Sequence, residues 1–259
     1  MSAPKRSRNV SKLNWREIEE INKNNSLLVI PVGATEQHGH HLPIETDSRI
    51  VYEIVKQSVE GLPDDVNVLY TPAIWFGYSE HHQGFPGLFS LKGDTLKRMV
   101  MDICIRANKE GFKKIMLVNG HGGNVLYLSA ASREMYDELG LKIGVVTYWD
   151  LITKEISENR DSPLGGINHA CELETSLMLY LDENSVRKEQ ICDNPIKKGK
   201  YNRADLLDSG VLLAGGIFKD ISDTGVVGMP SLANREKGEK IFKAGIKKMQ
   251  ELFLDYLQS

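Results

Sequence analysis

Short apolar runs alternate with longer amphipathic segments along most of the chain, and this rhythm limits the possible folds more than any other feature. The run at 26–32 (SLLVIPV) is too short for a helix and apolar throughout, as in a strand buried on both faces. Similar spacing predicts strands at 66–74, 114–118 and 142–148, and helices at 48–62, 94 or 95 to 108, 124–139, 170–181 and 234–257. Such alternation predicts an α/β fold with a mostly parallel sheet covered on both faces.

Composition excludes several classes of protein. The 32 basic and 35 acidic side chains give a net charge of −3, which argues against a nucleic-acid partner. No segment approaches the roughly 20 apolar residues that a bilayer span needs, and the first ten residues lack the apolar core of a signal peptide. Three widely spaced cysteines form neither a disulfide framework nor a zinc pair, so we expect a cytoplasmic protein. No linker or repeat divides the chain, which predicts one domain over residues 1–259.

The first candidate site follows the first predicted strand. Glu36 and His38 are two residues apart, so an extended backbone would point both side chains the same way. Asp47 follows where the next helix is expected to begin, and two carboxylates with an imidazole suit a divalent metal. The alternative is a polar loop in which Asp47 caps the helix. His40 and His41 are expected to be loop residues or to lie behind the ligands.

The sequence NGHGGN at 119–124 is a second candidate site, between the third strand and its helix. It departs from the dinucleotide fingerprint GxGxxG, because Val125 stands where the third glycine would be. Three glycines around one histidine indicate a backbone that turns sharply and leaves space beside His121. The pattern therefore favours a metal ligand at His121 over a plain turn.

The third candidate site is HACELETS at 169–176. If a helix begins near Ala170, His169 lies at its start, and Glu172 and Glu174 face different directions. One glutamate would then point into the site while the other caps the helix N-terminus, where negative charge is favourable. An ordinary acidic first turn would explain both glutamates, but it would not explain His169.

All seven histidines lie between His38 and His169. The two not yet placed, His81 and His82, belong to a polar and aromatic loop at 78–91 (YSEHHQGFPGLFSL). We expect them to be surface histidines, with contact to substrate or to another subunit as the alternative.

Together these motifs resemble the creatininase (creatinine amidohydrolase) family. The stretch VIPVGATEQHGHHLPIETD at 29–47 is similar to its N-terminal signature, and FPG at 85–87, NGHGGN and HACELETS match later blocks in the same order. The resemblance covers residues 13–181. It implies a three-layer α/β/α sandwich, a homo-oligomer that is usually a hexamer, and a centre of two divalent ions (Zn, Mn or Fe) that hydrolyses small cyclic amides or related C–N bonds.

The resemblance also implies a role for each matching residue. Glu36 and His121 would hold one metal, His38 would hold the other, and Asp47 would bridge the two. His169 matches the histidine that assists proton transfer to the leaving group.

The chain departs from creatinine-hydrolysing members of the family in its site residues. Those members carry a glutamate two residues after the metal histidine, where this chain has Gly123. We expect Glu174, with Glu172 as the second choice, to supply that carboxylate as a metal ligand and catalytic group. Those members also carry a tryptophan lid before the proton-transfer histidine, whereas residues 150–168 contain none and Trp149 is the nearest. Leu88 replaces a threonine found in many relatives.

These departures predict a branch of the family with a substrate other than creatinine. We expect a metal-dependent hydrolase that cleaves a small cyclic amide, a formamide or a related C–N bond with water activated by two metal ions. Cleavage of a C–C bond in a cyclic ketone, such as an oxidised inositol, is an alternative on the same site. Two further alternatives are a single-zinc hydrolase using Glu36, His38 and His121, and a ligand-binding α/β protein without catalysis.

Overall fold

Four parallel strands form the central sheet of the computed structural model, which describes residues 6–197, 199–201, 205–208 and 215–258. Their order is β2-β1-β3-β4. The bounds are β1 Leu27–Val32, β2 Val68–Tyr70, β3 Lys114–Asn119 and β4 Ile143–Thr147. All four predicted strands are therefore confirmed, although β2 is shorter than the run at 66–74 from which it was predicted.

The inner strand β1 is buried along its whole length but contains Pro31, which has no N–H to donate to a neighbouring strand. The pairing with β2 ends at Tyr70, before it reaches the level of Pro31. Beyond that point Ile74 takes over, donating its N–H to the Pro31 carbonyl and accepting the N–H of Gly33, both at 2.9 Å. The proline thus sits where the missing N–H leaves no strand hydrogen bond unmade.

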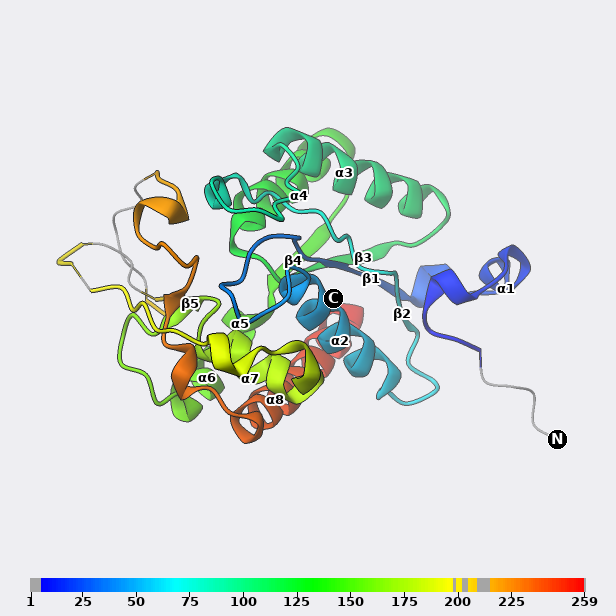
Figure 1. Cartoon of the computed structure of the whole chain (residues 1–259). Helices are drawn as coiled ribbons and strands as arrows, with labels where there is room; N and C mark the ends of the chain where they lie inside the picture. Colours follow the sequence, from blue (N-terminus) through cyan, green and yellow to red (C-terminus); the bar gives the residue numbers. More distant parts are fainter. Residues whose placement is uncertain (1–5, 198, 202–204, 209–214, 259) are drawn as a thin grey trace.

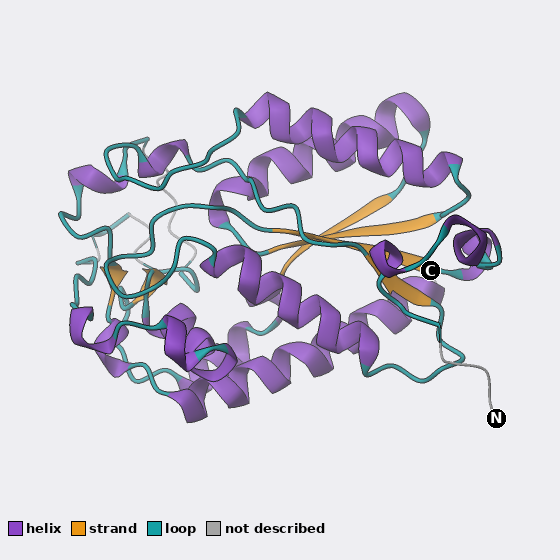
Figure 2. Cartoon of the chain, turned by 45° about the vertical axis from the view of Figure 1, so that its right-hand side comes forward, coloured by secondary structure: helices purple, strands orange, loops and turns teal. Residues whose placement is uncertain are grey.

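Helices cover both faces of the sheet and complete three layers (Figures 1 and 2). One layer contains α3 and α4, and the other contains α2, α7 and α8. Their bounds are α2 Thr46–Glu60, α3 Gly93–Lys109, α4 Val125–Leu139, α7 Glu172–Leu181 and α8 Arg235–Gln258. Alternate residues of β1 enter opposite cores, Leu27 beneath α2 and Leu28 beneath α3, as the pleat of a strand requires. The predicted α/β/α sandwich is confirmed.

Smaller elements complete the fold. The short helices are α1 Trp15–Glu19, α5 Tyr148–Leu151 and α6 Thr153–Asn159. A second, antiparallel sheet pairs β5 Ile167–His169 with β6 Val227–Gly228. None of the helices in the described ranges combines the length and the apolar character that crossing a bilayer requires.

Two predicted helix starts are wrong by a few residues. Helix α3 begins at Gly93 after Lys92, so neither Asp94 nor Thr95 caps it, because both already lie in its first turn. Helix α7 begins at Glu172 rather than near Ala170, because Ala170 has a left-handed backbone with φ of 49° and cannot belong to a right-handed helix.

The sheet provides one preferred place for a ligand. Strands β1 and β3 are neighbours, but the helix that follows β1 (α2) and the helix that follows β3 (α4) cover opposite faces. Open α/β sheets bind ligands at such a divergence, outside the carboxyl ends of the strands. The loops after β1 and β3 carry the first two motifs singled out in the sequence.

Candidate metal centre

Histidines and carboxylates from six segments converge at the carboxyl ends of β1 and β3. They come from the loops that follow β1, β2 and β3, from β5, and from the first turns of α2 and α7. Seven of them are at most 6 % exposed: Glu36, His38, Asp47, His82, His121, His169 and Glu174. The structure thus brings together every residue that the sequence singled out as a metal or catalytic residue, and it adds His82.

Asp47 lies between two imidazoles. Its Oδ1 is 3.1 Å from Nε2 of His38, and its Oδ2 is 2.9 Å from Nδ1 of His121. Helix α2 begins at Thr46, so Asp47 sits in the first turn, where the helix dipole stabilises its charge, and it does not cap the helix. One carboxylate therefore faces both the His38 side and the His121 side of the cluster.

Glu36 is fully buried beside histidine nitrogens without being hydrogen bonded to them. Its oxygens lie 2.9 Å from Nε2 of His82 and 3.2 Å from Nε2 of His121, but neither oxygen accepts a well-aligned hydrogen bond from a described residue. Oδ2 of Asp47 likewise lacks a hydrogen-bond donor within the described structure. Buried carboxylate oxygens without donors are costly, whereas a cation among them would satisfy both groups. The donor set therefore fits a divalent metal.

The two asparagines of NGHGGN hold the loop of His121 in place. Asn119 accepts the N–H of His121 at 3.2 Å and donates to its carbonyl at 2.8 Å. Asn124 donates to the carbonyl of Gly33 at 2.9 Å and accepts the N–H of Tyr78 at 2.9 Å, joining the loops that follow β1 and β2. Sequence reasoning missed this role, although an asparagine at each end of the motif was its signal.

The start of α7 separates its two glutamates. Oε1 of Glu174 lies 3.8 Å from Nε2 of His38, inside the cluster. Glu172 points away: it accepts the N–H groups of residues 161 and 162 at 2.8 and 2.9 Å and pairs with the buried Lys237. Ala170, in its left-handed conformation, turns the chain from β5 into α7 at a cost of about 1–2 kcal/mol. This turn directs both His169 and Glu174 to the site.

The expectation that His81 and His82 are surface residues is wrong. His82 is fully buried, and His81 is half-buried beside it. The amide of Gln37 fixes the proton on His82, because its Nε2 donates to Nδ1 of His82 at 2.8 Å while its Oε1 accepts the N–H of Gly39 at 2.8 Å. Nδ1 of His82 is therefore an acceptor, and Nε2, facing Glu36, carries the hydrogen.

His169 is oriented by the same loop. Its Nε2 donates to the carbonyl of Gln37 at 2.7 Å, so the free lone pair is on Nδ1, 3.7 Å from Oε1 of Glu36. Of the other loop histidines, His41 is buried with its Nε2 2.9 Å from Oγ1 of Thr175, and His40 is exposed.

The buried carboxylates favour protonation of the histidines beside them. Burial opposes protonation of His38, but the charges of Asp47 and Glu174 outweigh it and raise the pKa of His38 to about 10. Burial likewise opposes protonation of His121, but Glu36 and Asp47 raise its pKa to about 9. Without metal these imidazoles hold protons, and a divalent ion would displace the protons when it binds.

In two other groups of the cluster, burial shifts the pKa in favour of the uncharged form. Burial raises the pKa of Glu174 to about 7, against the opposing charge of His38. Burial, reinforced by the neighbouring His38 and His82, lowers the pKa of His169 well below its usual value. At neutral pH, His169 is therefore an uncharged imidazole.

A cavity of about 190 Å³ opens onto the cluster. Besides site residues, Trp149, Leu206 and Phe218 line it, and Phe218 stacks on His82 with ring centroids 4.4 Å apart. No lysine or arginine is among its lining residues in the part of the chain that the structure describes. The cavity is thus small, partly aromatic and without a fixed cation.

Fold and site together define an α/β/α protein whose buried histidines and carboxylates can hold metal. The family model described as "Creatininase: Creatinine amidohydrolase" matches residues 11–253. The chain belongs to the creatininase family of metal-dependent hydrolases.

Similar proteins in the family differ in what they act on. The chain is 31% identical to the mycofactocin precursor peptide peptidase of Mycolicibacterium smegmatis, covering 83% of this chain and 79% of the relative. It is 31% identical to the creatinine amidohydrolase of Pseudomonas putida, covering 72% and 76%. It is 28% identical to the 3-dehydro-scyllo-inosose hydrolase of Thermotoga maritima, covering 95% and 80%.

Solved creatininase structures share the fold. A mutant creatininase described as "Zn-Zn type" superposes with a TM-score of 0.82 at 26% identity, covering 96% of this chain and 98% of its own. One described as "Creatininase Mn" gives a TM-score of 0.80 at 27% identity, with the same coverage.

Proposed function

We propose that this protein is a dinuclear metal hydrolase that cleaves a small cyclic amide, a formamide or a related C–N bond. The observation that carries the proposal is Asp47, whose two oxygens face His38 and His121 separately, at 3.1 and 2.9 Å. A carboxylate placed between two imidazoles has the arrangement of a bridging ligand, whereas a single-metal site needs no such residue.

The remaining donors divide between the two sides of Asp47. Glu36 and His121 would hold one ion, and His38 and Glu174 would hold the other, which supports Glu174 over Glu172 as the additional carboxylate. When bound, two such ions lower the pKa of a shared water from about 15.7 to about 7, so that a nucleophile is available at neutral pH.

The chain's own side chains would move the protons. Glu174 would relay a proton from the water that the metals activate. His169 keeps a proton at Nε2 against Gln37 and presents Nδ1 to the cluster, where it would receive a proton and pass it to the leaving group. The aromatic wall of Phe218 would limit the access of bulk water to this transfer.

The shape of the cavity supports a small, uncharged substrate. Its volume of about 190 Å³ compares with the roughly 150 Å³ cavity that admits benzene. A substrate other than creatinine is supported by Gly123, where a side-chain carbon would lie only 2.2 Å from the carbonyl of Tyr78. The backbone at this position thus excludes the glutamate of creatinine-hydrolysing members, so another residue must supply the metal-binding and catalytic carboxylate.

Metal content and activity test the proposal together. After reconstitution with Zn²⁺, Mn²⁺ or Fe²⁺, elemental analysis should find about two ions per chain, and a chelator should abolish turnover. One ion per chain would instead support the single-zinc hydrolase, and none would support a ligand-binding protein. The reconstituted enzyme should be screened against cyclic ureides, formamides and cyclic ketones; turnover of ketones alone would assign C–C cleavage.

We further propose that the chain forms a homo-oligomer, with a hexamer favoured, in the cytoplasm. Support comes from Trp75, Phe76 and Phe89, which are 39 to 58% exposed although large and apolar, and from three cysteines that are all free. Light scattering should give about six times the chain mass of 29.1 kDa.

A further inference from the structure

The backbone beside His121 has no room for a side chain at residue 123. A carbon added to Gly123 would lie 2.2 Å from the carbonyl of Tyr78, 2.5 Å from Nε2 of His121 and 2.7 Å from Cε1 of His81. The two imidazoles that flank this point are nearly parallel, at 11° with ring centroids 5.4 Å apart. The ring of His81 therefore lies close to where a side chain of residue 123 would begin.

His81 and His82 are neighbours, but they differ in the hydrogen bonds that their ring nitrogens make. His82 accepts a hydrogen bond at Nδ1 and so carries its hydrogen on Nε2, towards Glu36, whereas His121 gives its Nε2 hydrogen to the carbonyl of Tyr78 at 2.9 Å and keeps Nδ1 free for a metal. His81 makes only ring contacts within the described residues, with no hydrogen bond to either nitrogen. Of the two, His81 is the one with a free lone pair.

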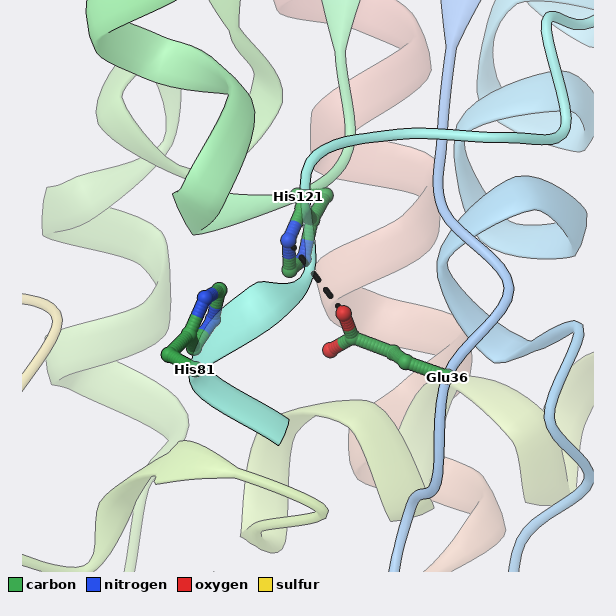
Figure 3. Close-up of side chains that lie close together, drawn as sticks. All are labelled: Glu36, His81 and His121. Carbon is green, nitrogen blue, oxygen red and sulfur yellow. Dashed lines mark ion pairs between the residues drawn. The ribbon is translucent and has the colours of Figure 1, made fainter. Parts of the chain in front are cut away.

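Glu36, His81 and His121 are close enough to share an ion. One ligand atom of each lies within 4.8 Å of the others. Figure 3 shows the three side chains directed into a common space from the loops after β1, β2 and β3. Donors with metal bonds of about 2.0–2.2 Å lie at most about 4.4 Å apart, so the three groups are spaced closely enough to serve one ion.

We propose that the imidazole of His81 is a metal donor beside Glu36 and His121, on the side of the site where residue 123 cannot supply a carboxylate; Glu174 supplies its carboxylate on the other side, against His38. This inference rests on the proposed dinuclear centre. An imidazole where relatives have a carboxylate removes one negative charge from this side of the site and leaves two imidazoles and one carboxylate besides Asp47. Imidazole suits zinc, whereas carboxylate suits manganese, so this side of the site should prefer Zn²⁺ over Mn²⁺.

Titration of the metal-free full-length chain with Zn²⁺ alone and with Mn²⁺ alone, against a chromophoric chelator, tests the proposal. The variants are His81→Phe, which keeps an aromatic ring on His121, and His40→Phe as an exposed control. Wild type and His40→Phe should bind two Zn²⁺. His81→Phe should bind one as tightly and the second at least about 100-fold more weakly, since even losing a partner behind a ligand costs 10–100-fold.

A second readout is the visible spectrum of the Co²⁺-substituted protein, which should change in His81→Phe because a nitrogen donor is lost. Two tight Zn²⁺ ions and an unchanged Co²⁺ spectrum in His81→Phe would overturn the role of His81 while leaving the dinuclear centre intact. A wild-type protein that binds fewer than two ions would overturn the proposed function itself. If thermal melting shows that His81→Phe does not fold, His81→Gln carries the same expectations.

Discussion

The two sides of the metal centre are built differently. On the His38 side, Asp47 and Glu174 occupy the first turns of α2 and α7, so packed helices fix their positions. On the His121 side, the donors lie in loops after three strands, and hydrogen bonds from Asn124 hold those loops together. Packed helices therefore set one half of this site and a loop network sets the other, while Asp47 faces both.

The largest effect is expected from Asp47→Asn, because this residue faces both sides. The variant should lose both metals, and kcat/KM should fall at least about 10³-fold, since bound ions supply several kcal/mol of transition-state stabilisation. Elemental analysis and kinetics on the screened substrate measure this. The matched control is Asp94→Asn, an exposed aspartate in the first turn of α3. Two retained metals in Asp47→Asn would show that the sides are independent and that Asp47 does not bridge them.

His169→Gln should separate proton transfer from metal binding. The variant should keep two metals while kcat falls about 10²–10⁴-fold, the range for loss of a general acid or base. His38, His169 and Glu174 each offer a ligand atom within 4.8 Å of the others. If the variant loses one metal as readily as Glu174→Gln does, His169 is a ligand on the His38 side and not the proton donor.

The sequence predicted some parts of the fold and the site better than others. Apolar runs and helical spacing predicted all four strands of the central sheet and its two covering layers. Because parallel strands end at one edge, the motifs after β1 and β3 could be placed together from the order of the elements alone. The loop of His81 and His82 has no periodicity, so its burial could not be predicted. His82 is oriented by Gln37, 45 residues away, and that contact exists only after the sheet has formed.

The start of α7 shows a second limit of prediction from the sequence. Spacing alone predicted that Glu172 and Glu174 point in different directions, but not which one faces the site. That choice depends on Lys237, which lies 65 residues further along in α8 and pairs with Glu172. The left-handed backbone of Ala170 was also unpredictable, because alanine rarely adopts it and a helix start two residues earlier was the simpler expectation.

The two glutamates should give opposite results when each is changed to glutamine. Glu172→Gln should lower the free energy of unfolding by about 3 kcal/mol, because it breaks a buried ion pair, while the metal content stays at two. Glu174→Gln should not lower the stability of the metal-free protein, because it removes a buried carboxylate whose ionisation is unfavourable, but it should lose the ion on the His38 side. Urea unfolding and elemental analysis on both variants measure this. A metal loss in Glu172→Gln without unfolding would restore Glu172 as the missing carboxylate.

The smallest effect on the working enzyme is expected from pH, because only the metal-free protein should show a pH-dependent free energy of unfolding. His38 and His121 have folded-state pKa values of about 10 and 9, above the ordinary value of 6.5. The folded chain therefore binds more protons than the unfolded chain in this window. Their contribution to stability is fully present below pH 6.5 and is lost as the pH rises through about 9 to 10.

Between pH 7 and 9, the free energy of unfolding of chelated protein should fall by about 2 kcal/mol per pH unit, about 1 kcal/mol for each histidine. Glu174 acts in the same direction at lower pH, because its pKa is raised from 4.5 to about 7 and its contribution is lost between these two values. With two Zn²⁺ bound, the ions replace these protons and the slope should vanish. His38→Gln should reduce the slope of the metal-free protein by about half, because one of the two histidines that titrate across this range is gone. An equal slope with and without metal would show that the ions bind elsewhere.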